Sequence, residues 1–157
     1  DWSSDVCSSD LDGGPVRGWA IGHENNVWGN TAPGVWYEGY YFPAAAAWMC
    51  QHIWEHYAFT LDREFLKDNF DTMLSAALFW VDDLWTDERD GTLVANPSYS
   101  PEHGAYTLGC SFDQEVIWEL FTEVINAADI LAVEDETVLA QIAETIASKS
   151  SMDSSQA

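Results

Sequence analysis

One loop of the sequence combines residue types that could carry out acid catalysis. It reads Asn-Pro-Ser-Tyr-Ser-Pro-Glu-His over residues 96–103, so two prolines stiffen the backbone around one carboxylate, that of Glu102. A carboxyl group can protonate a leaving oxygen when burial or a second carboxylate raises its pKa. Tyr99, Tyr106 and Asp113 are close enough in sequence to supply such surroundings. The loop predicts a general acid, with an exposed loop glutamate as the alternative.

A second motif with chemical potential lies earlier in the chain. His52, Glu55 and His56 form the H-x-x-E-H pattern of inverted zinc peptidases. Histidines four residues apart share one helix face, and the glutamate could act as a base. A peptidase also needs a third ligand, for which Glu119 or Glu123 could be nominated, although nothing singles out either. The alternative is a helix whose polar residues flank an apolar stripe, and we predict no metal and no cofactor.

Four helices are expected to position these motifs. Pro43 can open the first, because a proline lacks only an N–H that would be unpaired in a first turn. Asp62 is a typical N-cap for the second, and Ser111 or Asp113 could cap the third. Apolar residues at helical spacing predict helices over residues 43–60, 63–85, 111–131 and 134–146.

The connections between these helices are unequal in length. Asp90-Gly91 predicts a turn, and residues 92–95 could form a short strand before the loop that carries Glu102. Short loops join the other helices, which predicts two antiparallel helical hairpins. The hairpins could close a bundle, or they could be an arc of a larger helical toroid with exposed apolar flanks.

The ends of the chain differ in composition from its middle. Residues 1–11 are rich in Ser and Asp and contain a near-repeat, so we expect an artefact or a disordered segment. Residues 12–147 are expected to form the folded region. The polar residues 148–157 are expected to be a disordered tail.

The composition argues against several kinds of partner. The 157 residues include 5 Lys and Arg against 27 Asp and Glu, a net charge of −22. Nucleic acids and anionic membranes bind basic surfaces, so we expect neither as a partner. The nine tryptophans offer flat surfaces for sugar rings, although any one of them is more often part of a core or interface.

Further residues recur in an order and with gaps that match one enzyme family. The stretches are Gly18-Trp19, His23, Trp28, Thr31-Ala32-Pro33, residues 47–57, Asp62-Arg63-Glu64-Phe65-Leu66, Leu93-Val94, residues 96–102, Phe112-Asp113-Gln114 and Glu119-Leu120-Phe121. In this combination, residues 17–131 resemble the catalytic domain of glycoside hydrolase family 95, the α-1,2-L-fucosidases. Each motif alone is weak, and the specificity lies in the combination.

The resemblance implies an all-α fold and a carbohydrate substrate. The family fold is an (α/α)6 barrel, of which residues 12–147 would supply about four of twelve helices. Missing N- and C-terminal parts of the same enzyme would then complete the domain. The implied activity is hydrolysis of a terminal α-L-fucosyl, or related L-sugar, linkage in an oligosaccharide or glycan. The family also suggests secretion or a periplasmic location in a bacterium.

The resemblance also implies an inverting mechanism. In this chemistry a carboxylic acid protonates the leaving oxygen while a base activates water on the opposite face of the sugar. Glu102 matches the family's general acid. The water-activating asparagines would precede this chain and their partner aspartate would follow it, so we expect the chain to be inactive alone. The alternative is a non-catalytic helical domain that binds carbohydrate or is a degenerate copy.

Several more residues are expected near the sugar. Trp28 and Trp36 could stack on a ring, and His23 and Asn26 could bind hydroxyl groups. Asp113 could contact the substrate, or it could simply be a first-turn residue favoured by the helix dipole.

Two departures from the family pattern bear on which sugar is bound. The family's Asn-Thr-Asp is Glu24-Asn25-Asn26 here, so an amide replaces a carboxylate at Asn26. The family's Pro-Glu-Asn becomes Pro-Glu-His, which makes His103 a further candidate for substrate binding.

Overall fold

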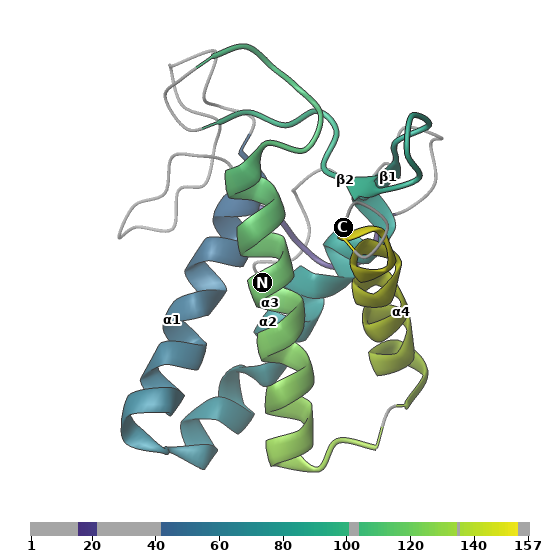
Figure 1. The fold of residues 1–157 in the computed structure, drawn as a ribbon. Coiled ribbons are helices and arrows are strands. Elements are labelled where there is room, and N and C mark those ends of the chain that lie inside the picture. The colour runs from purple at the N-terminus through teal and green to yellow at the C-terminus, as the bar shows by residue number, and fades with distance from the viewer. Residues whose placement is uncertain (1–15, 22–41, 101–103, 135, 154–157) are drawn as a thin grey trace.

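The computed structural model describes residues 16–21, 42–100, 104–134 and 136–153. This part of the chain is mostly helical (Figure 1), as expected for part of an (α/α)6 barrel. Its elements, in chain order, are α1 (Ala44–Thr60), α2 (Arg63–Asp83), β1 (Trp85–Thr86), β2 (Leu93–Val94), α3 (Ser111–Leu131) and α4 (Glu136–Asp153). No described helix is long and apolar enough to cross a membrane.

The first two helices begin where the sequence predicts. Pro43 is the N-cap of α1, and the Asp62 carboxylate caps α2 by accepting a 3.0 Å hydrogen bond from the backbone N–H of Phe65. Helix α2 ends at Asp83, two residues before the expected end, because the chain there turns into β1. Strand β1, which the sequence analysis missed, pairs antiparallel with β2, with Trp85 opposite Val94.

The third helix begins differently from the prediction. Its N-cap is Cys110, whose carbonyl accepts the first helical hydrogen bond from Gln114, so the expectation of Ser111 or Asp113 as the cap was wrong. Both residues lie inside the first turn. The fourth helix also differs, since it starts at Glu136 and continues past Ile146 to Asp153.

Helix α3 lies at the centre of the packing. It contacts α1, α2 and α4, and α1 lies beside it with the same chain direction (Figure 1). The largest fully buried apolar side chains come from all four helices, and they are Trp80, Leu66, Met73, Leu120, Ile142, Val124 and Cys50. The loop that precedes α3 therefore stands on a helix that contacts all three of the other helices.

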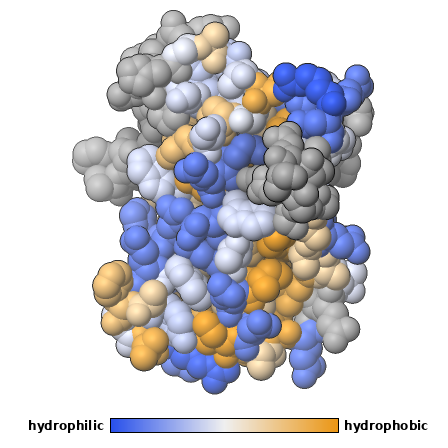
Figure 2. All heavy atoms as spheres, viewed as in Figure 1, coloured by the Kyte–Doolittle hydropathy of each residue, from blue (hydrophilic) through white to orange (hydrophobic). Residues whose placement is uncertain are grey.

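Some apolar surface stays uncovered. Trp48 and Met49 of α1 are about half exposed, and Phe59 and Leu61 at the α1–α2 turn are 89% and 71% exposed. Figure 2 shows hydrophobic patches among hydrophilic residues at the end of the molecule away from the α3 loop. Exposed apolar flanks of this kind are the expectation for an arc of a larger helical assembly.

A short segment before the helices packs tightly on α2. The Arg17 guanidinium binds both carboxylate oxygens of Asp82, at 2.8 and 2.7 Å, and the Trp19 indole N–H donates to the carbonyl of Thr72 at 3.0 Å. Between them, Gly18 has a φ of +78°, and a Cβ there would lie 1.9 Å from the carbonyl oxygen of Ser75. Only glycine allows this approach of backbone to helix.

The helical core also holds a carboxyl group. Glu123 of α3 is 4% exposed, and its Oε2 atom has no hydrogen-bond partner within the described chain. Burial, together with smaller contributions from the nearby negative charges of Glu119 and Glu55, raises the pKa of Glu123 to about 8. Burial and the Glu123 charge together raise the pKa of the Cys50 thiol to about 12. Glu123 is therefore largely protonated at neutral pH.

The close approach at Gly18 predicts a selective loss of stability. Gly18→Ala should lower the free energy of unfolding by at least about 3 kcal/mol, because it adds a steric clash to the left-handed conformation. Gly91→Ala is the matched control, since Gly91 has nearly the same φ, +79°, with nothing within 4 Å of its Cβ position. It should cost only about 1–2 kcal/mol. Parallel thermal unfolding of the full-length protein would measure both, and equal losses would contradict the clash.

The buried Glu123 predicts a stability that falls as pH rises. Its folded pKa of about 8 lies above the ordinary 4.5, so the folded state binds the proton more tightly. The contribution is fully present below pH 4.5 and is lost as the pH rises to 8, by a few kcal/mol on the order-of-magnitude scale of such shifts. Urea midpoints from pH 5 to 8.5 should fall less for Glu123→Gln than for the unchanged protein. Glu115→Gln, on the exposed side of α3, should leave the pH dependence unchanged.

Candidate active-site loop

The structure places one of the predicted site residues, Asp113, in the first turn of α3. The others lie outside the described residues, and they are Glu102, His103, His23, Asn26, Trp28 and Trp36. The described geometry of the site is therefore that of the loop on both sides of Glu102 and of the helix on which it stands.

The two arms of the loop are hydrogen-bonded to each other. Ser98 and Thr107 form an isolated antiparallel bridge in which each backbone N–H donates to the other's carbonyl at 2.8 Å. The rings of Tyr99 and Tyr106, one residue further in, lie 5.4 Å apart. The described residues on the two sides of Glu102 are thus joined to each other by backbone hydrogen bonds and by a ring contact.

A buried hydroxyl joins this bridge to α3. The Ser98 Oγ donates to Asp113 Oδ2 at 2.6 Å and accepts a 2.8 Å hydrogen bond from the backbone N–H of Cys110. Ser98 is 1% exposed and Asp113 is 3% exposed. The pKa of Asp113 is raised by its burial, while interactions with Ser98, Cys110 and the Tyr99 backbone oppose the increase. The carboxylate predicted to contact substrate thus has its observed contacts within the loop.

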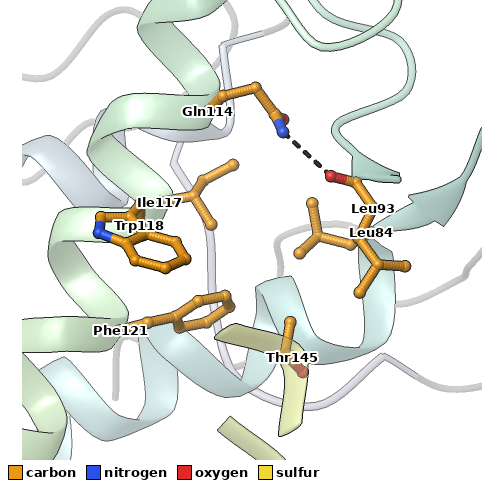
Figure 3. Close-up of a pocket in the computed structure, with 7 residues that line it drawn as sticks. All are labelled: Leu84, Leu93, Gln114, Ile117, Trp118, Phe121 and Thr145. Atoms are coloured by element: carbon orange, nitrogen blue, oxygen red, sulfur yellow. Dashed lines mark hydrogen bonds between the residues drawn. The ribbon is translucent and has the colours of Figure 1, made fainter. Parts of the chain in front are cut away.

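Gln114 holds the start of the same arm, before Ser98. Its side-chain amide accepts a 3.0 Å hydrogen bond from the backbone N–H of Ala95 and donates a 3.0 Å bond to the carbonyl of Leu93 (Figure 3). The backbone N–H of Gly109 also donates to the Ala95 carbonyl, at 2.9 Å. A side chain at position 109 would press on Val94, because a Cβ there would lie 2.9 Å from the Val94 Cγ1.

Sequence reasoning missed the structural roles of Ser98 and Gln114. Both belong to the motifs that it singled out, Asn-Pro-Ser and Phe-Asp-Gln, but the partners of their side chains lie 12 to 21 residues away. A buried side-chain hydroxyl or amide that hydrogen-bonds to the backbone does not recur at a regular spacing in the sequence, so no periodic pattern reveals it. The two prolines that flank it, Pro97 and Pro101, were the local sign in the sequence that the backbone at Ser98 is constrained.

Two hollows lie near the loop. An open groove of about 350 Å³ beside it is lined by Arg89, Asn96, Pro97, Tyr106, Thr107 and Leu108. The other lies between α3, β2 and α4 and is lined mainly by apolar side chains (Figure 3). Its volume of about 20 Å³ holds little more than one water molecule, so a sugar ring does not fit there.

The H-x-x-E-H motif lies on the exposed side of α1. His52 Nδ1 and Glu55 Oε2 are 3.7 Å apart, with side chains 70% and 64% exposed, and the His56 ring packs against Phe65 at 3.9 Å. Glu123, one of the nominated third ligands, is buried in the core. Within the part of the chain that the structure describes, no three potential ligands are close enough to hold a metal ion.

Comparison with known proteins agrees with the helical architecture and the loop motif. The sequence profile described as "Glycosyl hydrolase family 95 catalytic domain" matches residues 8–156. A protein named "Probable alpha-fucosidase A" from Aspergillus niger is 38% identical over 120 residues, 72% of this chain and 15% of that protein. "Alpha-L-fucosidase 2" from Arabidopsis thaliana is 30% identical over 140 residues, 81% of this chain and 16% of that protein.

These matches cover most of this chain but only a small part of each relative. The chain spans about 15–16% of the length of the two relatives, while the family profile covers nearly all of the chain itself. The family match confirms the resemblance predicted from the sequence motifs. The chain belongs to the catalytic-domain family of glycosyl hydrolase family 95.

Proposed function

We propose that this chain carries the general acid of an α-L-fucosidase-like glycoside hydrolase, and that Glu102 is that acid. The substrate is a glycan or oligosaccharide with a terminal α-L-fucosyl, or related L-sugar, residue. Membership of the family and the names of the two fucosidase relatives support the sugar. The sequence match of Pro101-Glu102 to the family's acid supports the residue.

One structural observation supports the role of the loop most strongly. Asp113 and Gln114 hold the arm before Glu102 on the first turn of α3, and the bridge between Ser98 and Thr107 joins the arm after Glu102 to it. A loop with both arms held in this way can present a side chain at a defined place relative to a rigid helix. A general acid needs such placement, because proton transfer requires approach within hydrogen-bond distance of the leaving oxygen. An exposed glutamate in an untethered loop would need no such anchoring.

The proposed reaction proceeds with inversion at the sugar carbon. The Glu102 carboxylic acid gives its proton to the glycosidic oxygen as the bond to the sugar breaks, and a base-activated water attacks from the opposite face. The base belongs to parts of the enzyme beyond this chain, so the 157 residues alone do not complete the cycle. His23, Asn26, Trp28, Trp36 and His103 are proposed to bind the sugar, by hydroxyl contacts or ring stacking.

The acid role predicts a loss that depends on the leaving group. In the full-length enzyme, Glu102→Gln should lower kcat for a natural fucosyl-oligosaccharide by about 10²–10⁴-fold, because the leaving alkoxide then departs without a proton. A fucoside with an acidic phenol as leaving group needs little protonation and should be hydrolysed at a rate much closer to that of the unchanged enzyme.

Steady-state kinetics on the two substrates measure this difference directly. Glu115→Gln makes the same chemical change on the exposed face of α3 and should alter neither rate. If Glu102→Gln kept its activity on the natural linkage, Glu102 would not be the acid. A full-length protein without activity on either substrate would instead favour a non-catalytic carbohydrate-binding or degenerate domain.

A further inference from the structure

Asp113 occupies a position where a carboxylate is normally exposed. Acidic residues in a first helical turn interact favourably with the helix dipole while remaining in water. Asp113 is instead 3% exposed, and its Oδ1 atom has no hydrogen-bond partner among the described residues. Burial of a carboxylate is costly unless hydrogen bonds compensate. One compensating contact is the 2.6 Å hydrogen bond from Ser98, a distance typical of a charge-assisted bond, and interactions with Cys110 and the Tyr99 backbone add to it.

Ser98 is the point where three parts of the loop meet. Its backbone pairs with Thr107 on the opposite arm, its hydroxyl accepts from the Cys110 N–H, and the same hydroxyl donates to Asp113. With both its acceptor and its donor used in a buried site, the hydroxyl has a single orientation. Loss of either partner would leave a buried polar group unsatisfied. The bridge, the N-cap of α3 and the first-turn carboxylate are therefore geometrically coupled.

We infer that Ser98 and Asp113 are a positioning pair, which sets the place of the general acid through the loop that carries it. The inference rests on the proposed function of Glu102, which lies four residues after Ser98 and five before Thr107. The pair touches neither substrate nor proton in this scheme. Asp113 is fixed to the backbone of α3, Ser98 is fixed to Asp113, and the bridge passes this geometry to the segment between its two residues.

The consequence for catalysis is specific to proton donation. A displacement of about 1 Å at a reacting group can cost on the order of 10²-fold in rate. Misplacement of the acid slows only reactions that need the proton, whereas general damage to the domain slows every reaction. A direct sugar contact by Asp113 differs from both, because its loss would raise KM for any fucoside.

The test compares three variants of the full-length enzyme on the two fucosides. Ser98→Ala removes the hydroxyl, and Asp113→Asn keeps an oxygen acceptor but removes the charge. Each should lower kcat for the natural linkage by roughly 10–100-fold, with less than about threefold change for the fucoside with the acidic phenol and little change in KM. Ser98→Thr, which restores a hydroxyl, should recover much of the rate.

Matched controls on α3 test whether the effect depends on the position of the substitution and not only on its type. Ser111→Ala and Asp129→Asn make the same changes at exposed positions of α3 and should leave both rates unchanged. If Ser98→Ala lowers the melting midpoint too far for assay, Asp113→Asn, the milder change, decides. The double variant should lose less than the product of the single losses, because both changes break one contact.

The outcomes distinguish failure of this inference from failure of the proposed function. Equal losses on both substrates, a rise in KM on both, or full activity in Ser98→Ala and Asp113→Asn would overturn the positioning role. If any of these occurred while Glu102→Gln still showed its leaving-group effect, the acid assignment would stand alone. If Glu102→Gln had no effect, the inference would fall together with the proposed function.

Discussion

The hydrogen bond between Ser98 and Asp113 connects the irregular part of this molecule to its regular part. The carboxylate of Asp113, buried in the first turn of α3, accepts this bond. The Ser98 hydroxyl also accepts a hydrogen bond from the backbone N–H of the N-cap residue Cys110. Because an unsatisfied group at this depth would be costly, the loop arm and the start of the helix stabilise each other. The position of α3 therefore sets the position of the loop arms.

Helix α3 can serve as this reference because it is held on three sides. It packs against α1, α2 and α4, and Leu120 and Val124 lie in the centre of that packing. The hairpin of β1 and β2 is joined to the same helix through Gln114, so both connections around the loop share one support.

This arrangement, in which a buried helix supports the loop, suits the acid catalysis proposed for this chain. A general acid must be held at a fixed position relative to its substrate. A helix that is buried on several faces can hold the loop that carries the acid in place. The buried Glu123 differs, because burial keeps its carboxyl largely protonated and its Oε2 atom has no hydrogen-bond partner among the described residues. We expect its protonation to affect the stability of the helical core.

Local sequence determined the helices, since their signals act over one or two turns. The apolar spacing, Pro43 and the Asp62 cap predicted α1 and α2, and the loop motif pointed to the family that the comparisons confirm. Tertiary structure alone decided the N-cap at Cys110, the pairing of β1 with β2 and the partners of Ser98, Gln114 and Gly18. These depend on groups 7 to 61 residues apart, from Thr86 and Leu93 at the near limit to Gly18 and Phe79 at the far one. No local preference specifies such contacts, because they form only when packed helices bring the two groups together.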